Sequence, residues 1–338
     1  MAWIGRDTDR LTRARSLVAA VFIAALACAG GSDRGTTAPS GGMSTQARTY
    51  LEGLVGLMQA NSINRLTIDW PAFRNTVFSV TPNAQTTVDT YPAITEALRL
   101  LGDGHSTFRT PTGSVLFVPT RTCRTTGTGN TAVPATIGYV RVGSFSGNTE
   151  QALTFANTIQ ATIKAADHDS IIGWVVDLRG NGGGNMWPMI AGIGPVLGEG
   201  IAGYFVDPIG LEISWEYRNG ASWNASFRIQ SVTTPYTLRK ERPKVAVLSD
   251  NGIASSGEAT LIAFRQRPNT RSFGVATCGL STANQGFPIN DGSLLNLTVA
   301  VMADRNKTKY GDQVTPDEVV TDPNEMLQRA ITWLRAPN

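Results

Sequence analysis

The stretch "KVAVLSDNGIASSGEATLIAF", residues 244–264, contains an apolar run, a turn of small residues and a second apolar run. The first run predicts a buried strand, and the second predicts a helix that begins near Ser255. Ser255 and Glu258 have the spacing of a helix capping box, which is a purely structural interpretation. A serine in such a turn also lies where helix amides converge and could stabilise a nucleophile and its oxyanion. The two interpretations are compatible.

The pattern of strand, turn and helix extends outward from this stretch. Because strands that alternate with helices build parallel sheets, we expect an α/β core with a largely parallel sheet. Apolar residues at helical spacing in residues 45–101 predict a small helical N-terminal region instead. Strands are predicted at 138–146, 170–180, 244–250, 272–276 and 294–305, and helices at 149–166, 186–198 and 323–336.

Two glycine-rich loops follow predicted strands, "DLRGNGGGN" at 177–185 and "DNGIASSGE" at 250–258. The carboxyl ends of parallel strands lie at one edge of the sheet, where ligands bind, so we expect these loops to meet. The glycines at 182–184 would let backbone amides approach a ligand closely, as an oxyanion hole requires. The loop lacks the Gly-Lys-Ser/Thr ending and the GxGxxG placement of phosphate-binding loops.

The chain contains 2 histidines. His105, in "LGDGHS" at 101–106, follows a helix end, where a charge partner for the helix is the ordinary interpretation and a catalytic base is the alternative. His168 lies between polar residues and is expected to be a solvated loop residue. No cysteine and histidine cluster has metal-ligand spacing, so we expect neither a metal nor another cofactor.

The composition allows one large domain or two of ordinary size, with enough apolar residues for a substantial core. The 338 residues include 29 basic and 26 acidic side chains, which give a net charge of +3. These charges are spread along the chain without a basic block, so nucleic acid is not an expected partner.

The N-terminus resembles a targeting segment. Residues 1–28 contain arginines and then an apolar run from Leu17 to Ala27, which is too short to span a bilayer and predicts an export signal. The end of this run, "AALAC", resembles a bacterial lipoprotein cleavage box with Cys28 as the acylated residue, and 29–44 is a flexible linker. We therefore expect a protein of the bacterial cell envelope, either periplasmic or tethered to the membrane through Cys28. Ordinary secretion is the alternative.

Two further cysteines, Cys123 and Cys278, remain in the exported part of the chain. In an oxidising compartment they permit one disulfide, although two separate buried thiols explain the sequence equally well.

Several motifs together resemble the tail-specific, or C-terminal processing, serine peptidases, in particular the branch that includes the tricorn protease core. They are "LGDGHS", "IGYVRVGSF", "VVDLRGNGGG", "ASSGE" and "TCGLSTANQGF", in that order. The resemblance covers roughly residues 45–325. It implies a crotonase/Clp-protease-like α/β core of ββα units at 108–330, after a helical region at 45–107, and peptide or unfolded protein as the substrate.

The resemblance also implies roles for residues of the two loops. Ser255 matches the nucleophile, and Glu258 matches the acid of the "SxxE" turn. The amides of Ser256 and Gly183 would form the oxyanion hole, with Gly182 or Gly184 as alternatives to Gly183. Ser256 would remain available to cap the helix.

The general base differs from that of many members. They pair the serine with a lysine at the position that Leu280 occupies here, so the Ser-Lys dyad is absent, and leucine cannot accept a proton. His105 matches the histidine of the tricorn-like branch and would be the base. The orienting acid would be Asp312, with Asp304 and Glu318 as alternatives. If none of these serves, a hydroxyl or a backbone carbonyl would hold the histidine.

The stretch 107–137 is too short to hold the PDZ domain that many members insert after the histidine loop. Two other functions remain compatible with the sequence. One is a catalytically silent binding protein on the same fold, and the other is an esterase or amidase with the same acyl-transfer site. The retained Ser255, His105 and glycine loop favour an enzyme.

Overall fold

Three α-helices form the N-terminal part of the described chain. The computed structural model describes residues 41–129 and 131–337, so the predicted export signal, Cys28 and most of the predicted linker lie outside the described residues. Ser44 caps α1, Asp69 caps α2, and α3 ends at Gly102 with a φ of 68°. Such residues are expected at helix ends. The helices are α1 (Thr45–Asn61), α2 (Trp70–Val80) and α3 (Tyr91–Leu101), and the 3-10 helix η2 (Val88–Thr90) precedes α3.

A parallel sheet of five strands forms the centre of the α/β part, in the order β13-β10-β9-β4-β3. Its central strands are buried along almost their whole length, as expected when helices cover both faces of a parallel sheet. The strands are β3 (Ile137–Arg141), β4 (Gly173–Asp177), β9 (Lys244–Ser249), β10 (Thr270–Gly274) and β13 (Glu318–Val319).

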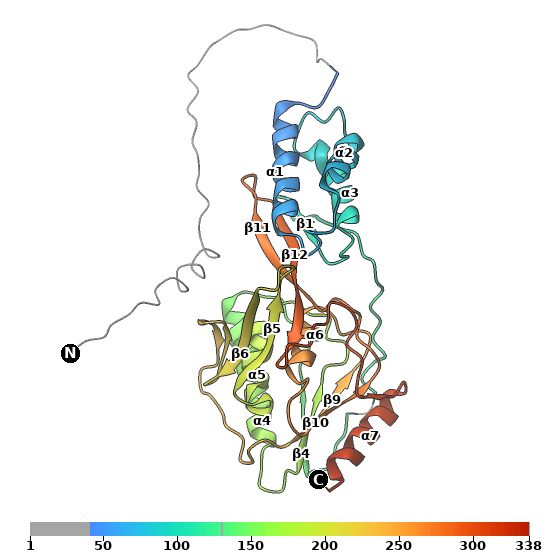
Figure 1. The fold of residues 1–338 in the computed structure, drawn as a ribbon. Helices are drawn as coiled ribbons and strands as arrows, with labels where there is room; N and C mark the ends of the chain where they lie inside the picture. The colour runs from blue at the N-terminus through green and yellow to red at the C-terminus, as the bar shows by residue number, and fades with distance from the viewer. Residues whose placement is uncertain (1–40, 130, 338) are drawn as a thin grey trace, which may run out of the picture. The chain divides into compact units, whose positions relative to one another are not determined.

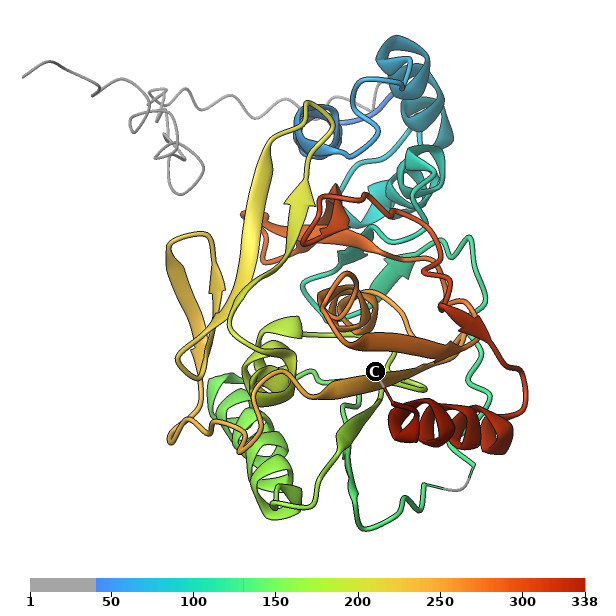
Figure 2. The ribbon, with the colours of Figure 1, turned by 60° about the horizontal axis from the view of Figure 1, so that its bottom comes forward.

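Helices cover both faces of this sheet. Trp174 and Val176 of β4 pack in the cluster that contains α4, α5 and α6, whereas Val175 between them packs in the cluster that contains α7. This alternation follows from the two-residue period of a strand. Figure 2 shows α7, in dark red, on the side of the sheet opposite α6. The helices are α4 (Thr149–Ala166), α5 (Met186–Leu197), α6 (Ser256–Ala263) and α7 (Pro323–Arg335).

A second sheet of eight strands is antiparallel, and the expectation of a largely parallel sheet is wrong for this half of the fold. The sheet has the order β2-β1-β12-β5-β6-β7-β8, and β11 pairs with β12. Its strands are β1 (Thr107–Arg109), β2 (Val115–Phe117), β5 (Gly200–Val206), β6 (Glu212–Arg218), β7 (Ala221–Asn224), β8 (Phe227–Ser231), β11 (Thr282–Pro288) and β12 (Leu294–Asp304).

The long strand β12 connects the helical region to the rest of the fold (Figure 1). Leu295 and Leu297 at its beginning pack with the buried side chains of α1, α2 and α3, and Met302 near its end packs with α5 and α6. The predicted α/β class with a small helical N-terminal region is confirmed. No helix within residues 41–129 and 131–337 has both the length and the apolar character needed to cross a membrane.

Candidate functional site

The two glycine-rich loops meet at one edge of the parallel sheet, as predicted. They follow β4 and β9, which are parallel neighbours. A Cβ atom added to Gly183 would lie 2.7 Å from the carbonyl oxygen of Ala254 and 2.9 Å from Cβ of Ser255. Gly183 also has a φ of 98°, which favours glycine. The glycine loop (residues 177–185) therefore lies directly against the serine turn (residues 250–258).

Ser255 has an unusual backbone conformation at the N-cap of α6. Its φ of 54° and ψ of −119° place a non-glycine residue in a sparsely populated region. Such strain costs on the order of 1–3 kcal/mol and clusters at functional sites. The expectation that Ser256 caps the helix is wrong, because Ser256 is the first residue of α6 and its hydroxyl donates to the carbonyl oxygen of Gly184 over 2.7 Å.

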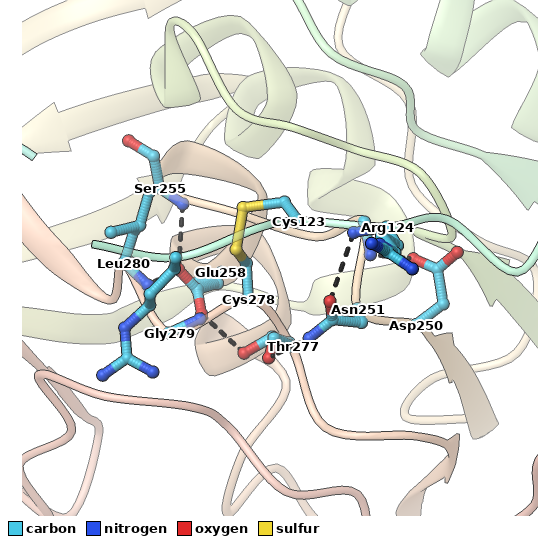
Figure 3. The surroundings of a disulfide bond; sticks show 12 residues. Cys123, Arg124, Asp250, Asn251, Ser255, Glu258, Thr277, Cys278, Gly279 and Leu280 are labelled. Atoms are coloured by element: carbon cyan, nitrogen blue, oxygen red, sulfur yellow. Dashed lines mark hydrogen bonds between the residues drawn. A yellow bond between two sulfur atoms is a disulfide. The ribbon is translucent and has the colours of Figure 1, made fainter. Parts of the chain in front are cut away.

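The carboxylate of Glu258 is buried beneath the serine turn (Figure 3). It accepts hydrogen bonds from the amides of Ser255, Gly279 and Leu280 and from the hydroxyl of Thr277. Burial raises the pKa of this carboxyl group to about 7, against these hydrogen bonds, which lower it. Glu258 thus joins the serine turn to the turn formed by residues 277–280.

A disulfide between Cys123 and Cys278 holds a third segment against the same turns, which decides between the two expectations for these cysteines. The Cα atoms are 5.1 Å apart. Beside the disulfide, the amide of Arg124 donates to Oδ1 of Asn251, and the hydroxyl of Thr125 donates to Asp250. Figure 3 shows the disulfide between the Glu258 contacts and the Arg124 contact.

His105 lies in the loop after α3 and contacts the first residue of β11, the strand that follows the turn formed by residues 277–280. Its Nδ1 atom lies 2.7 Å from Oγ1 of Thr282. Thr282 follows Leu280, whose amide donates to Glu258, by two residues. Burial lowers the pKa of His105 to about 4, although the charge of Asp103 raises it. The imidazole is therefore neutral at neutral pH and can accept a proton.

The proposed orienting carboxylates contact other groups. Asp312 pairs with Arg121 over 2.9 Å, and its side chain is 69% exposed. Asp304 accepts from the hydroxyl of Tyr310, and Glu318 pairs with Arg271 and Arg329. Within the described part of the chain, no hydrogen bond joins His105 to any of these three carboxylates. The expectation for them is therefore wrong in this structure, because other partners hold them, and a hydroxyl contacts the ring instead.

The predicted oxyanion donors differ in their present partners. The amide of Ser256 belongs to the first turn of α6, where amides have no acceptor within the helix. The amide of Gly183 donates to Oδ1 of Asn181 over 3.0 Å, and that of Gly182 donates to the hydroxyl of Ser144 over 2.8 Å. An oxyanion bound to Gly183 would have to replace Asn181 as its acceptor.

The other predicted features lie away from these loops. His168 is exposed and its Nδ1 atom lies 2.9 Å from the Ser170 hydroxyl. Where the structure describes the chain, no three His, Cys, Asp or Glu side chains are grouped closely enough to hold a metal ion.

Comparison with known sequences gives two informative relatives. The chain is 28% identical over 273 residues to the nisin-resistance protein of Lactococcus lactis subsp. lactis, and this match covers 79% of the chain and 80% of that protein. It is 29% identical over 164 residues to the carboxy-terminal processing protease CtpA of Bacillus subtilis (strain 168), which covers 48% of the chain and 30% of that protease.

Solved structures show the same fold. A lipoprotein from Streptococcus agalactiae has a TM-score of 0.68 at 22% identity, and the match covers 86% of this chain and 97% of that one. The photosystem II D1 C-terminal processing protease has a TM-score of 0.53 at 16% identity, with 83% and 94% covered.

The family description "Peptidase family S41" matches residues 136–320. This range is more than half of the chain, and it contains the glycine loop, the serine turn and Thr282. The resemblance to the C-terminal processing peptidases is confirmed, and the chain belongs to peptidase family S41.

Proposed function

We propose that this protein hydrolyses peptide bonds by acyl transfer, with Ser255 as the nucleophile and His105 as the general base. Membership of the family supports a serine peptidase that acts on peptides or proteins. The observation that carries the assignment of the nucleophile is the strained backbone of Ser255 at the start of α6, directly against Gly183. Such a conformation holds a side chain out of a sharp turn at a helix N-terminus, where negative charge is stabilised.

The base follows from the contacts of the histidine. If Nδ1 of His105 donates to Oγ1 of Thr282, Nε2 carries the free lone pair and can take the hydroxyl proton of Ser255. Glu258 binds the backbone amide of Ser255 and the turn that leads to Thr282, so it fixes the two reacting segments relative to each other.

The reaction then has two halves. Ser255 Oγ attacks the peptide carbonyl carbon while His105 takes its proton, and the amides of Ser256 and Gly183 stabilise the oxyanion. His105 gives the proton to the leaving amine, and an acyl-serine remains. A water molecule, deprotonated by His105, attacks this ester. The bond between the acyl carbon and Ser255 Oγ breaks, His105 returns the proton to Oγ, and the acid is released. Each oxyanion donor is worth on the order of 10²- to 10³-fold in rate.

The decisive experiment compares two neighbouring serines in the full chain. Ser255→Ala should abolish hydrolysis of peptides, whereas Ser256→Ala should keep much of it because only its backbone amide takes part. Nisin is a rational first peptide because a relative is named a nisin-resistance protein, and an unfolded protein and small esters complete the panel. A dead Ser256→Ala beside an active Ser255→Ala would show that the assignment is wrong by one residue.

The panel also separates the alternatives. Turnover of small esters or amides without peptide cleavage would favour the esterase or amidase. No turnover by a folded protein would favour the silent binder.

We also propose that the protein is exported to the cell envelope and lipid-anchored through Cys28. A relative named a nisin-resistance protein and a structural neighbour described as a lipoprotein support this location. Cys28→Ser should move the protein from the membrane fraction to the soluble fraction. Equal membrane association of both forms would contradict the lipid anchor.

A further inference from the structure

We propose that Thr282 is the positioning residue of the histidine, and that its hydroxyl replaces the carboxylate of a Ser-His-Asp triad. This inference rests on the proposed function. In such triads the third residue holds the imidazole in the correct tautomer and orientation. Here the only side chain with a hydrogen bond to a ring nitrogen of His105, among the described residues, is Thr282 at 2.7 Å.

The pairing of β11 with β12 fixes the backbone around Thr282. Thr282 begins β11 and pairs with Val301 of β12. The preceding residue, Ser281, accepts the amide of Met302 through its carbonyl oxygen. A β-branched side chain in a strand has few χ1 rotamers, so the direction of the hydroxyl is defined.

The histidine loop is held by separate contacts. The amide of His105 donates to Oδ1 of Asp103 over 2.8 Å, and its carbonyl oxygen accepts from Nδ2 of Asn284 over 3.0 Å. Asn284 and Thr282 belong to the same strand. β11 therefore holds the backbone of His105 through one residue and its ring through the other.

The charges around the ring distinguish this arrangement from a carboxylate triad. From β11, the histidine faces Thr282 and Asn284, which are uncharged. On its own loop Asp103 carries a charge, but its oxygens accept from the amides of His105 and Ser106 and from the Ser106 hydroxyl. No carboxylate in the described ranges binds Nδ1, so a protonated imidazole gains no ion pair there.

This arrangement has a kinetic consequence. A neutral partner keeps the imidazole in its neutral, proton-accepting form at acidic pH, which agrees with the direction in which burial moves the pKa of His105. A carboxylate at position 282 would stabilise the imidazolium and would move the loss of activity to higher pH.

The first test compares Thr282→Val, Thr282→Ser and Thr282→Asp in the full chain, with kcat and KM measured across pH. Thr282→Val should lower kcat about 3- to 10-fold with KM nearly unchanged, as expected for one neutral hydrogen bond. Thr282→Ser keeps the hydroxyl, so its kcat should lie within about twofold of the wild-type kcat. Thr282→Asp should raise the midpoint of the acidic limb by about one pH unit or more.

The second test needs no activity. Since the chain has 2 histidines, ring ¹⁵N chemical shifts can be assigned with a His168→Gln variant. The wild type should show His105 protonated at Nδ1, and Thr282→Val should show a mixture of tautomers. A proton on Nε2 in the wild type would overturn the inference.

The outcomes also separate this inference from the proposed function. A wild type whose hydrolysis depends on Ser255, with normal kcat and an unmoved acidic limb in Thr282→Val and Thr282→Asp, would refute the role of Thr282 alone. A wild type without hydrolysis that depends on Ser255 would refute the proposed function, whatever the ¹⁵N shifts show.

Discussion

Replacement of Glu258 by glutamine should change how the stability of the protein depends on pH. Burial raises the pKa of Glu258 from its ordinary value of 4.5 to about 7. Between these values the unfolded chain releases a proton that the folded protein keeps, so this group's contribution to the free energy of unfolding falls as pH rises. One pKa unit corresponds to about 1.36 kcal/mol. The contribution present near pH 4.5 and lost by pH 7 is therefore about 3 kcal/mol.

Glutamine removes this dependence because it is neutral throughout the range. The side-chain NH2 group of glutamine is itself a donor, and it would face the backbone NH groups of Ser255, Gly279 and Leu280, which are also donors. At least one hydrogen bond is therefore lost. That loss costs about 2 kcal/mol at every pH. The destabilisation caused by Glu258→Gln should then be about 3 kcal/mol larger near pH 4.5 than near pH 7.5.

Denaturant unfolding at the two pH values measures this difference. The matched control is Glu52→Gln on the exposed face of α1, which should change stability little at either pH. Equal destabilisation by Glu258→Gln at both pH values would contradict this prediction, because it would mean that the buried carboxyl group titrates at its ordinary pKa.

Three further predictions concern the disulfide, the glycine loop and the base. Reduction of the Cys123–Cys278 disulfide should lower the free energy of unfolding by about 2–5 kcal/mol. It should also slow the labelling of Ser255 by a fluorophosphonate probe, because Cys278 lies in the turn that binds the buried carboxylate of Glu258. An unchanged labelling rate would contradict this. Gly183→Ala should lower hydrolysis more than about tenfold through strain at positive φ, whereas Gly53→Ala, whose Cβ would meet nothing within 4 Å, should leave activity unchanged and raise stability by up to about 1 kcal/mol. Since His105 must be neutral to act as a base, the rate of hydrolysis should stay constant down to about pH 5 and fall as the pH approaches the His105 pKa of about 4. A fall in rate with a midpoint near pH 6.5 would show that burial does not lower the pKa of the ring.

Local signals are sufficient for the elements of the parallel half of the fold, except for the two-residue strand β13. Helix α4 has the predicted bounds, because Asn148 and Gln151 form a capping box at its start. The strands β4 and β9 each contain an uninterrupted apolar run, at 174–176 and 245–248, and a strand buried on both faces requires such a run. The edge at which the two loops meet follows from the parallel direction of these strands.

Apart from β12, which the apolar run at 294–305 predicts, the antiparallel sheet has no comparable local signal. Residues 212–218, "EISWEYR", mix charged and apolar side chains, and their burial depends on pairing with β5, which itself pairs with β12 about a hundred residues away. Such long-range pairing decides which of these side chains are buried, and it cannot be predicted from the local sequence pattern.

The candidate site also combines features that local sequence predicts with features that depend on long-range contacts. Local sequence predicts the serine turn and the glycine loop, whereas for His105 it offers a catalytic base only as an alternative, which the family resemblance then favours. The contact between His105 and Thr282 joins residues 177 positions apart, and no spacing rule predicts it. The resemblance implies Asp312 as the orienting acid, but Arg121, from a distant segment, binds it instead.

Labelling of the full chain with a fluorophosphonate probe, followed by peptide mapping, determines whether Ser255 is an activated nucleophile. We expect one modified residue, Ser255, with modification lost in His105→Ala and retained in Ser256→Ala. A folded wild-type protein that takes no label, or that takes it at another residue, would contradict the assignment of Ser255 as an activated nucleophile.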